Sequence, residues 1–74
     1  MGQKPETVSM GYQMIPVESS VIAAVGYENG TLAVRFHNAG IYYHPGVPYS
    51  IFLGLLSATS VGTYYNQYIR GRYR

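Results

Sequence analysis

The hydrophobic pattern of the chain changes its period near the middle. Residues 21–27 are apolar and partly β-branched, residues 31–37 alternate between apolar and polar, and residues 41–44 form a third short run. A period of two is typical of strands that bury one face. The sequences between the runs, Asn29-Gly30 and residues 38–40, are typical of turns. The three runs are therefore predicted to form an antiparallel, three-stranded β-meander.

Two sets of apolar residues with helical spacing follow the predicted strands. The first set begins after Pro48, which suits the first position of a helix. The second set follows Ser60, a favourable N-cap, and stops at Gly71, a favourable left-handed C-cap. The sets are Ile51, Phe52, Leu55 and Leu56, and then Val61, Tyr64, Tyr65, Tyr68 and Ile69. We therefore predict an α+β domain over residues 14–74, with two short helices packed on one face of the sheet.

The turn lengths predict a register for the sheet. A two-residue turn at Asn29-Gly30 and a three-residue loop at 38–40 decide which residues face each other. The predicted pairs are Tyr27 with Leu32, Val25 with Val34, Ala23 with Phe36, Phe36 with Tyr42, Val34 with His44, and Arg35 with Tyr43. The face away from the helices would carry Ile22, Ala24, Gly26, Ala33 and Ile41. Because that face is apolar, we expect either residues 1–13 or a second copy of the chain, in a homo-oligomer, to cover it.

Length and composition narrow the class of protein. At 74 residues the chain is a single domain, whose core supplies roughly a few kcal/mol of net stability. Residues 1–13 have no clear period and are predicted to be a flexible leader or an expression remnant. The chain has no cysteine, which excludes disulfides and thiolate zinc sites. With no signal peptide and no run of about 18 apolar residues, we predict a cytoplasmic protein without a membrane partner.

Positive charge and tyrosine concentrate at the C-terminal end. The net charge is only +2, yet three of the five basic residues lie in the last five positions, and the chain has nine tyrosines. Arginine forms charge-assisted bonds with phosphate, and tyrosine rings stack on bases, so this end predicts a surface for single-stranded nucleic acid. The candidate binding residues are Tyr65, Asn66, Arg70, Arg72, Tyr73 and Arg74.

The helical spacing divides these candidates into two groups. Tyr65, together with Tyr64, Tyr68 and Ile69, falls on the stripe that faces the sheet, and these four residues are predicted to anchor the second helix. Asn66 either reads a polar ligand edge or faces solvent. The residues predicted to extend from the end of the helix near Gly71 are Arg70, Arg72, Tyr73 and Arg74. A basic chain end that is simply solvated is the alternative interpretation.

Two further candidate sites lie in the first half of the chain. Ser19 and Ser20 precede the first predicted strand and either donate hydrogen bonds to an anion or cap a turn. Arg35 and Tyr43 are predicted to be neighbours on the sheet face away from the helices. They either form a cation–π pair or face a ligand together.

The sequence gives little support for catalysis or metal binding. A serine nucleophile needs a histidine base and an orienting acid. His37 and His44 are predicted on opposite faces of the sheet, and the chain has no aspartate. The same separation leaves no set of metal ligands, and the glycines lack the spacing of a phosphate-binding loop. We predict a protein that is not an enzyme and has no cofactor or metal.

Several short sequences, taken together, resemble the KTSC domain family over about residues 14–73. In chain order they are Val17-Glu18-Ser19-Ser20, Val25-Gly26-Tyr27, Leu32-Ala33-Val34-Arg35-Phe36, Gly40-Ile41-Tyr42, Val47-Pro48, and Ser60-Val61-Gly62-Thr63-Tyr64-Tyr65-Asn66 with Ile69 and Arg70. The family occurs at the C-terminus of some lysyl-tRNA synthetases and as free-standing bacterial or phage proteins. Its central Tyr-x-Tyr maps on residues 42–44, so His44 replaces the second tyrosine. The synthetase context of the resemblance implies RNA binding.

Three functions remain open at the level of sequence. The leading hypothesis is a non-catalytic module that binds RNA or single-stranded nucleic acid through the C-terminal arginines and tyrosines. The second is a small homo-oligomer that sequesters a nucleotide or another phosphate-bearing small molecule at a subunit interface. The third is a protein-interaction domain that uses the apolar outer face of the sheet.

Overall fold

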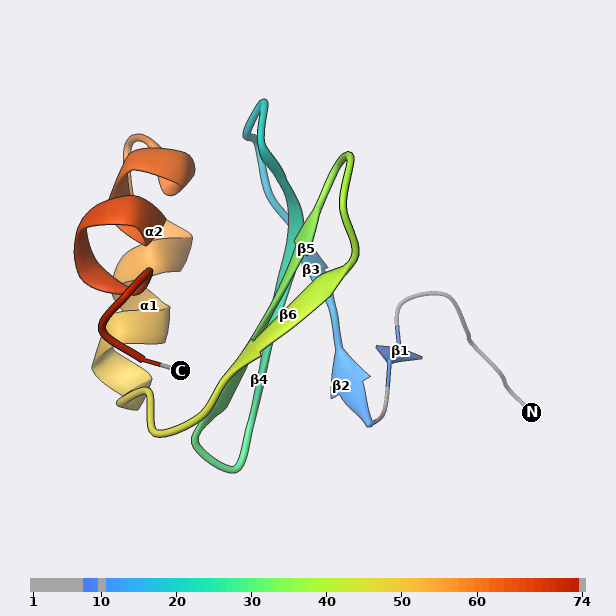
Figure 1. Ribbon diagram of the computed structural model, residues 1–74, viewed down its shortest axis with the longest axis vertical. Coiled ribbons are helices and arrows are strands. Elements are labelled where there is room, and N and C mark those ends of the chain that lie inside the picture. The colour runs from blue at the N-terminus through green and yellow to red at the C-terminus, as the bar shows by residue number, and fades with distance from the viewer. Residues whose placement is uncertain (1–7, 10, 74) are drawn as a thin grey trace.

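A four-stranded antiparallel sheet with two helices on one face forms the body of the molecule (Figure 1). The computed structural model describes residues 8–9 and 11–73. The elements are β1 (Val8–Ser9), β2 (Tyr12–Gln13), β3 (Ile15–Pro16), β4 (Ile22–Glu28), β5 (Thr31–Phe36), β6 (Ile41–His44), α1 (Tyr49–Ser57) and α2 (Val61–Tyr68). The sheet order is β3-β4-β5-β6, and β1 pairs with β2 in a separate hairpin. The predicted α+β class, with a β-meander followed by two helices, is confirmed.

The strand β3 is an addition to the predicted meander. It pairs with β4 through Ile15 opposite Val25 and Pro16 opposite Ala24. Because proline lacks a backbone donor, it is tolerated at the edge of a sheet, where β3 lies. A strand of two residues leaves no period in the sequence, which is why the pattern did not predict it. Strand β2 falls in the predicted leader, of which residues 1–7 and 10 lie outside the described residues.

The hairpin of β4 and β5 has the predicted turn, but the strands pair differently at the beginning of β4. Asn29 and Gly30 have φ of 50° and 81°, which is typical of the type I′ turn. Tyr27 faces Leu32 and Val25 faces Val34, as predicted. The predicted pair of Ala23 with Phe36 is wrong, because the register shifts between Ile22 and Ala24 and Ile22 faces Phe36 instead. This bulge turns Ile22 from the predicted outer face into the core between sheet and helices.

The register of β5 and β6 is displaced by two residues from the prediction. The observed pairs are Leu32 with His44, Ala33 with Tyr43, Val34 with Tyr42, and Arg35 with Ile41. The connection is longer than the predicted loop: Phe36 N donates to Gly40 O over 3.3 Å, and His37 N donates across to Val21 O over 3.0 Å. Because a shift of two preserves the side-chain faces, Arg35 and Tyr43 still share the outer face, but they are not directly opposite.

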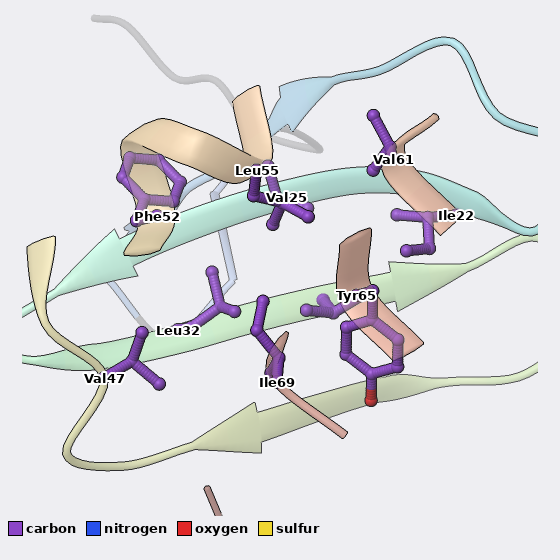
Figure 2. Close-up of a cluster of buried hydrophobic side chains, with 10 residues drawn as sticks. Ile22, Val25, Leu32, Val47, Phe52, Leu55, Val61, Tyr65 and Ile69 are labelled. Carbon is purple, nitrogen blue, oxygen red and sulfur yellow. The ribbon is translucent and has the colours of Figure 1, made fainter. Parts of the chain in front are cut away.

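The inner face of the sheet and the helices enclose the main core (Figure 2). Ile22, Leu32 and Leu55 are completely buried there, and the helical stripes supply its other side as predicted. Tyr68 is the exception: it was predicted to anchor the second helix, but it is 46% exposed. The helices approach closely, because a Cβ on Gly54 would collide with the Tyr64 hydroxyl, which donates to Ile51 O over 3.1 Å. The buried members of the core are Ile22, Val25, Leu32, Val34, Val47, Phe52, Leu55, Val61, Tyr65 and Ile69.

The chain itself covers the outer face of the sheet. Met14, Ala24 and Ala33 form a second buried cluster, against which Tyr12 and Ile41 pack. At Gly26 a Cβ would lie 2.9 Å from Met14 Sδ and 3.0 Å from Gln13 O, so the crossing chain needs a glycine there. The cover that the sequence required is therefore supplied within one chain. A homo-oligomer through this face stays a prediction.

Candidate functional site

A cleft of about 670 Å³ opens where the end of the sheet meets α2. One wall is the loop before β4, which contributes Glu18, Ser19 and Ser20, and another is the hairpin of β5 and β6. The third wall is α2 together with Arg70, which follows it. The buried side chains of Ile22, Val61 and Tyr65 also line the cleft. The site therefore combines an apolar floor with a polar rim, which is the usual composition of a ligand pocket.

The serine loop is held by its own hydrogen bonds. Ser19 Oγ accepts hydrogen bonds from the backbone N of Val21 and of Ile22, each over 3.1 Å. His37 Nε2 lies 2.9 Å from the Ser19 carbonyl oxygen, which can only accept, so Nε2 carries the proton. Of the two predicted roles of Ser19, anion binding and capping of a turn, the structure shows the second. Its hydroxyl can still donate a hydrogen bond, and Ser20 lies exposed on the same wall.

The polar side chains of α2 face the cleft at helical spacing. Ser60 is the N-cap, as predicted, and its Oγ accepts a hydrogen bond from Thr63 N over 3.3 Å. Thr63, Asn66 and Arg70 follow one another at intervals of three and four and all line the cleft. Arg70 Nη1 lies 3.5 Å from Asn66 Oδ1, a long and weak bond. The arginine and the amide therefore present adjacent polar groups to the same space.

Tyr65 anchors α2, as its helical spacing predicted. Its ring is 7% exposed, and its hydroxyl lies 2.9 Å from His44 Nε2. Burial raises the pKa of the Tyr65 phenol above its ordinary value, while the nearby Arg70 charge lowers it and Tyr42 raises it. Tyr65 was also predicted to bind nucleic acid. It forms part of the floor of the cleft and is too buried to serve as an exposed stacking surface for bases.

The residues after α2 do not form one surface. Gly71 has φ of 80°, the predicted left-handed conformation, and the chain turns back there. The prediction that Gly71 caps the helix is wrong, because α2 ends at Tyr68 and Ile69 is its C-cap. Tyr73 does not project as the sequence predicted, because its ring packs against the main core and its carbonyl lies 2.8 Å from His44 Nδ1. Arg72 Nε donates to Gln67 O over 3.2 Å, and Arg72 does not line the cleft. Arg74 lies outside the described residues.

Arg35 and Tyr43 lie away from this cleft. Both occupy the outer face, where the Tyr43 ring centroid lies 5.4 Å from that of Tyr12. The structure therefore separates the residues predicted to bind into three places. Ser19, Ser20, Asn66 and Arg70 meet at the cleft, with Tyr65 in its floor; Arg72 and Tyr73 belong to the turn after α2; Arg35 and Tyr43 lie on the outer face.

Some cleft residues had no clear signal in the sequence. Tyr42 is 53% exposed at the edge strand, although the alternation placed it on the inner face. Phe36 contacts it edge to face, with ring centroids 5.3 Å apart. Thr63 and Glu18 also line the cleft. The helical interval between Thr63, Asn66 and Arg70 is the signal that would have found this wall.

The described residues contain no group of three or more histidines or acidic residues placed to hold a metal ion. Among the same residues, neither helix is long and apolar enough to cross a bilayer. The fold and the cleft thus define a small α+β domain with a ligand-sized site built from hydroxyls, an amide and one arginine. The KTSC domain model matches residues 18–73. The chain belongs to the KTSC domain family, which confirms the resemblance seen in the sequence.

The chain is similar to two further proteins, one of them a solved KTSC domain structure. A protein of Tsukamurella paurometabola is 41% identical over 63 residues, which cover 82% of this chain and 94% of that protein. The crystal structure of a KTSC domain protein from Yersinia pestis matches with a TM-score of 0.83 and 34% identity. The match covers 85% of this chain and 92% of the Yersinia chain. The described fold is therefore also the fold of a solved member of the family.

Proposed function

We propose that this KTSC domain is a non-catalytic module that binds single-stranded nucleic acid, with a nucleotide unit seated in the cleft beside α2. The observation that carries the proposal is the meeting of Arg70, Asn66 and Ser20 around one cleft with exposed Tyr42 at its edge. The volume of about 670 Å³ falls within the range of roughly 300–1,000 Å³ that is typical of small-ligand sites.

The charges of the cleft favour a ligand with a single negative charge. Arg70 is the one basic residue among the described lining residues, and Glu18 is the one acidic residue. A phosphodiester carries one charge, which the guanidinium can bind through paired hydrogen bonds. A triphosphate would bring more negative charge than Arg70 can neutralise and would also meet Glu18. This balance supports a strand of nucleic acid over a free nucleoside triphosphate.

The aromatic edge of the cleft supports base stacking. Tyr42 is half exposed, and Phe36 and Tyr65 lie behind it with their rings 5.5 Å apart. Stacking on a tyrosine is tolerant of base identity and contributes about 1–3 kcal/mol per base in single-strand binding proteins. Asn66, beside Arg70, supplies the amide that can donate to or accept from a base or a sugar hydroxyl.

The placement of the histidines supports a role without catalysis. His37 approaches the backbone carbonyl of Ser19 and not its hydroxyl, while Ser19 Oγ accepts from two backbone N–H groups. His44 uses both ring nitrogens for Tyr65 and Tyr73. Neither histidine is therefore placed to activate a serine, as a nucleophile would require.

The alternative is a free phosphate-bearing small molecule in the same cleft, sequestered by an oligomer. The concave shape and the size of the cleft favour this candidate, because a mononucleotide would fill such a space. A mononucleotide and a strand both place a phosphate beside a ring. They differ in the charge of the phosphate and in whether the chain of nucleotides continues beyond the cleft. Light scattering of the purified protein would test the oligomer.

Binding of a labelled oligonucleotide at about 50 mM salt tests the proposal. Arg70→Ala should weaken binding about tenfold or more, since bonds to a charged group contribute roughly 1.5–3 kcal/mol. Arg72→Ala is the matched control. It removes the same charge only two residues along the chain, but the Arg72 side chain does not line the cleft. Competition by free mononucleotides at equal affinity would favour the sequestering alternative, and no affinity for RNA or single-stranded DNA would contradict the proposal.

A further inference from the structure

The buried imidazole of His44 joins two segments that are distant from it in the sequence. His44 lies on β6 and is 9% exposed. Its Nε2 lies 2.9 Å from the Tyr65 hydroxyl in α2, and its Nδ1 lies 2.8 Å from the carbonyl oxygen of Tyr73 after α2. One side chain of the sheet thus holds both ends of the segment 65–73.

The hydrogen bonds of this imidazole have fixed directions in its neutral form. The carbonyl of Tyr73 can only accept, so Nδ1 of His44 carries the proton and donates. Nε2 then accepts from the hydroxyl of Tyr65. The ring therefore acts as a donor toward the chain end and as an acceptor toward the helix, and each bond can be removed separately.

Arg70 lies between the two points that His44 holds. The backbone N of Arg70 donates to Tyr65 O over 2.9 Å, and the backbone N of Tyr73 donates to Ile69 O over 3.1 Å. Gly71, with φ of 80°, reverses the chain between them. Arg70 is thus carried by a closed turn whose two ends are tied to one residue of the sheet.

We propose that His44 is a positioning residue for Arg70: by holding Tyr65 and Tyr73, it fixes the turn from which the guanidinium reaches the cleft. The inference rests on the proposed role of Arg70 in binding. A binding group that is held in place before the ligand arrives loses less conformational freedom on binding, so the ligand binds more tightly. His44 does not line the cleft itself and acts through its two partners.

Two conservative variants separate the bonds. In His44→Gln the side-chain amide lies near the position of Nε2, so it can keep the hydrogen bond with the Tyr65 hydroxyl but loses the hydrogen bond to the Tyr73 carbonyl. In His44→Asn the side-chain amide lies near the position of Nδ1, so it can keep the hydrogen bond to the Tyr73 carbonyl. Hydrogen exchange should show the Arg72 and Tyr73 amides, which donate to Ile69 O, exchanging about fivefold faster in His44→Gln. The same amides should keep their protection in His44→Asn relative to the amides of β4 and β5.

An equal increase over all amides of the sheet in His44→Gln would overturn the proposal, because it would mean that His44 only stabilises the whole fold. Unchanged exchange would also overturn it, since buried Ile69 would then hold the turn alone. This measurement needs no ligand, so it stands even if the wild-type protein binds no nucleic acid and the proposed function fails.

Oligonucleotide binding supplies the second readout. His44→Gln should weaken binding about fivefold in the wild-type background and have no effect when Arg70 is already alanine, because the two residues then act on one contact. Additive losses in the double variant would overturn the positioning role. Circular dichroism of each variant at the assay temperature confirms that the loss is measured on folded protein.

Discussion

The two faces of the sheet are buried by different parts of the chain. The outer face carries small residues, Ala24, Gly26 and Ala33, and the chain of β2 and Met14 lies directly on them. The inner face carries large aliphatic residues under two helices. At Gly26 the crossing chain comes so close that even a Cβ would meet it, whereas a cleft opens where one end of the inner face meets α2. The candidate site therefore lies where packing between elements is incomplete.

A buried charge on the closed face should have the largest effect. Ala33 is completely buried beneath Met14, so Ala33→Glu should destabilise the domain by about 3 kcal/mol or more and leave it unfolded. Thr63→Glu puts the same side chain on the open cleft wall and should change stability by about 0.5 kcal/mol or less. Circular dichroism shows whether Ala33→Glu folds at all, and urea denaturation measures the stability of Thr63→Glu and of any folded Ala33→Glu. Equal losses would contradict the difference between the faces.

Adding one methyl group to a glycine should have opposite effects on the two sides. Gly26→Ala would force the new Cβ against Met14 Sδ and Gln13 O, at a cost of about 1–3 kcal/mol. Gly62→Ala meets Ser19 Oγ at an ordinary 3.7 Å and should stabilise α2 by roughly 0.5 kcal/mol through its helix propensity. The melting temperatures of the two variants, compared with that of the wild-type protein, measure both effects. A stable Gly26→Ala would show that the crossing chain does not pack closely.

Removal of the Tyr65 hydroxyl should cost about 1–2 kcal/mol at neutral pH. In Tyr65→Phe the buried Nε2 of His44 loses its partner, and an unsatisfied buried group costs about that much. Tyr68→Phe, which changes an exposed ring on the same helix, is the control. Chemical denaturation of both variants measures the difference, and equal stability would show that water replaces the bond.

The same phenol should make the domain sensitive to alkali. Burial raises the pKa of Tyr65 in the folded protein above the unfolded value of about 10. The folded state therefore holds this proton more tightly, so the stability it contributes is present below about pH 10 and is lost as the pH rises through the folded pKa. Tyr65→Phe should lose stability less steeply above about pH 10 than the wild-type protein. Denaturation midpoints at several alkaline pH values test the slope.

The smallest expected effect is the loss of the α2 cap. Ser60→Ala removes the oxygen that accepts from Thr63 N and should cost about 1 kcal/mol. Ser57→Ala, in α1, removes only a bond to Leu53 O within the helix and should stay within about 0.5 kcal/mol of the wild-type stability. The two denaturation curves give the difference, and coincident curves would mean that water caps α2 equally well.

The sequence predicted the periodic parts of this fold well. The alternation of 31–37, the Asn29-Gly30 turn and the stripe through Phe52, Leu55, Val61 and Tyr65 all appear as expected, because each leaves a repeated signal. The errors in strand pairing lie where a local irregularity of the chain changes the geometry. The bulge beside Ala23 moves Ile22 to the inner face, and the longer connection after Phe36 displaces the register of β6.

The candidate site could be predicted only in part, for a related reason. Asn66 and Arg70 were found by their chemistry, but composition alone joined them with Arg72 and Tyr73. The turn at Gly71 and the bond from His44 send Tyr73 toward the core, and such a contact between distant residues leaves no local pattern. The sequence therefore predicted which residues carry useful chemistry better than which of them meet.

Titration of ¹⁵N-labelled protein with a short single-stranded RNA shows whether the cleft binds nucleic acid, because each amide reports its own surroundings. The proposal predicts that the largest shifts fall on Ser20, Thr63, Asn66 and Arg70 around the cleft. Amides of Arg35 and Tyr43 on the outer face should change little. Shifts centred on the outer face, or a spectrum that RNA leaves unchanged, would contradict the assignment of the cleft as a nucleic-acid site.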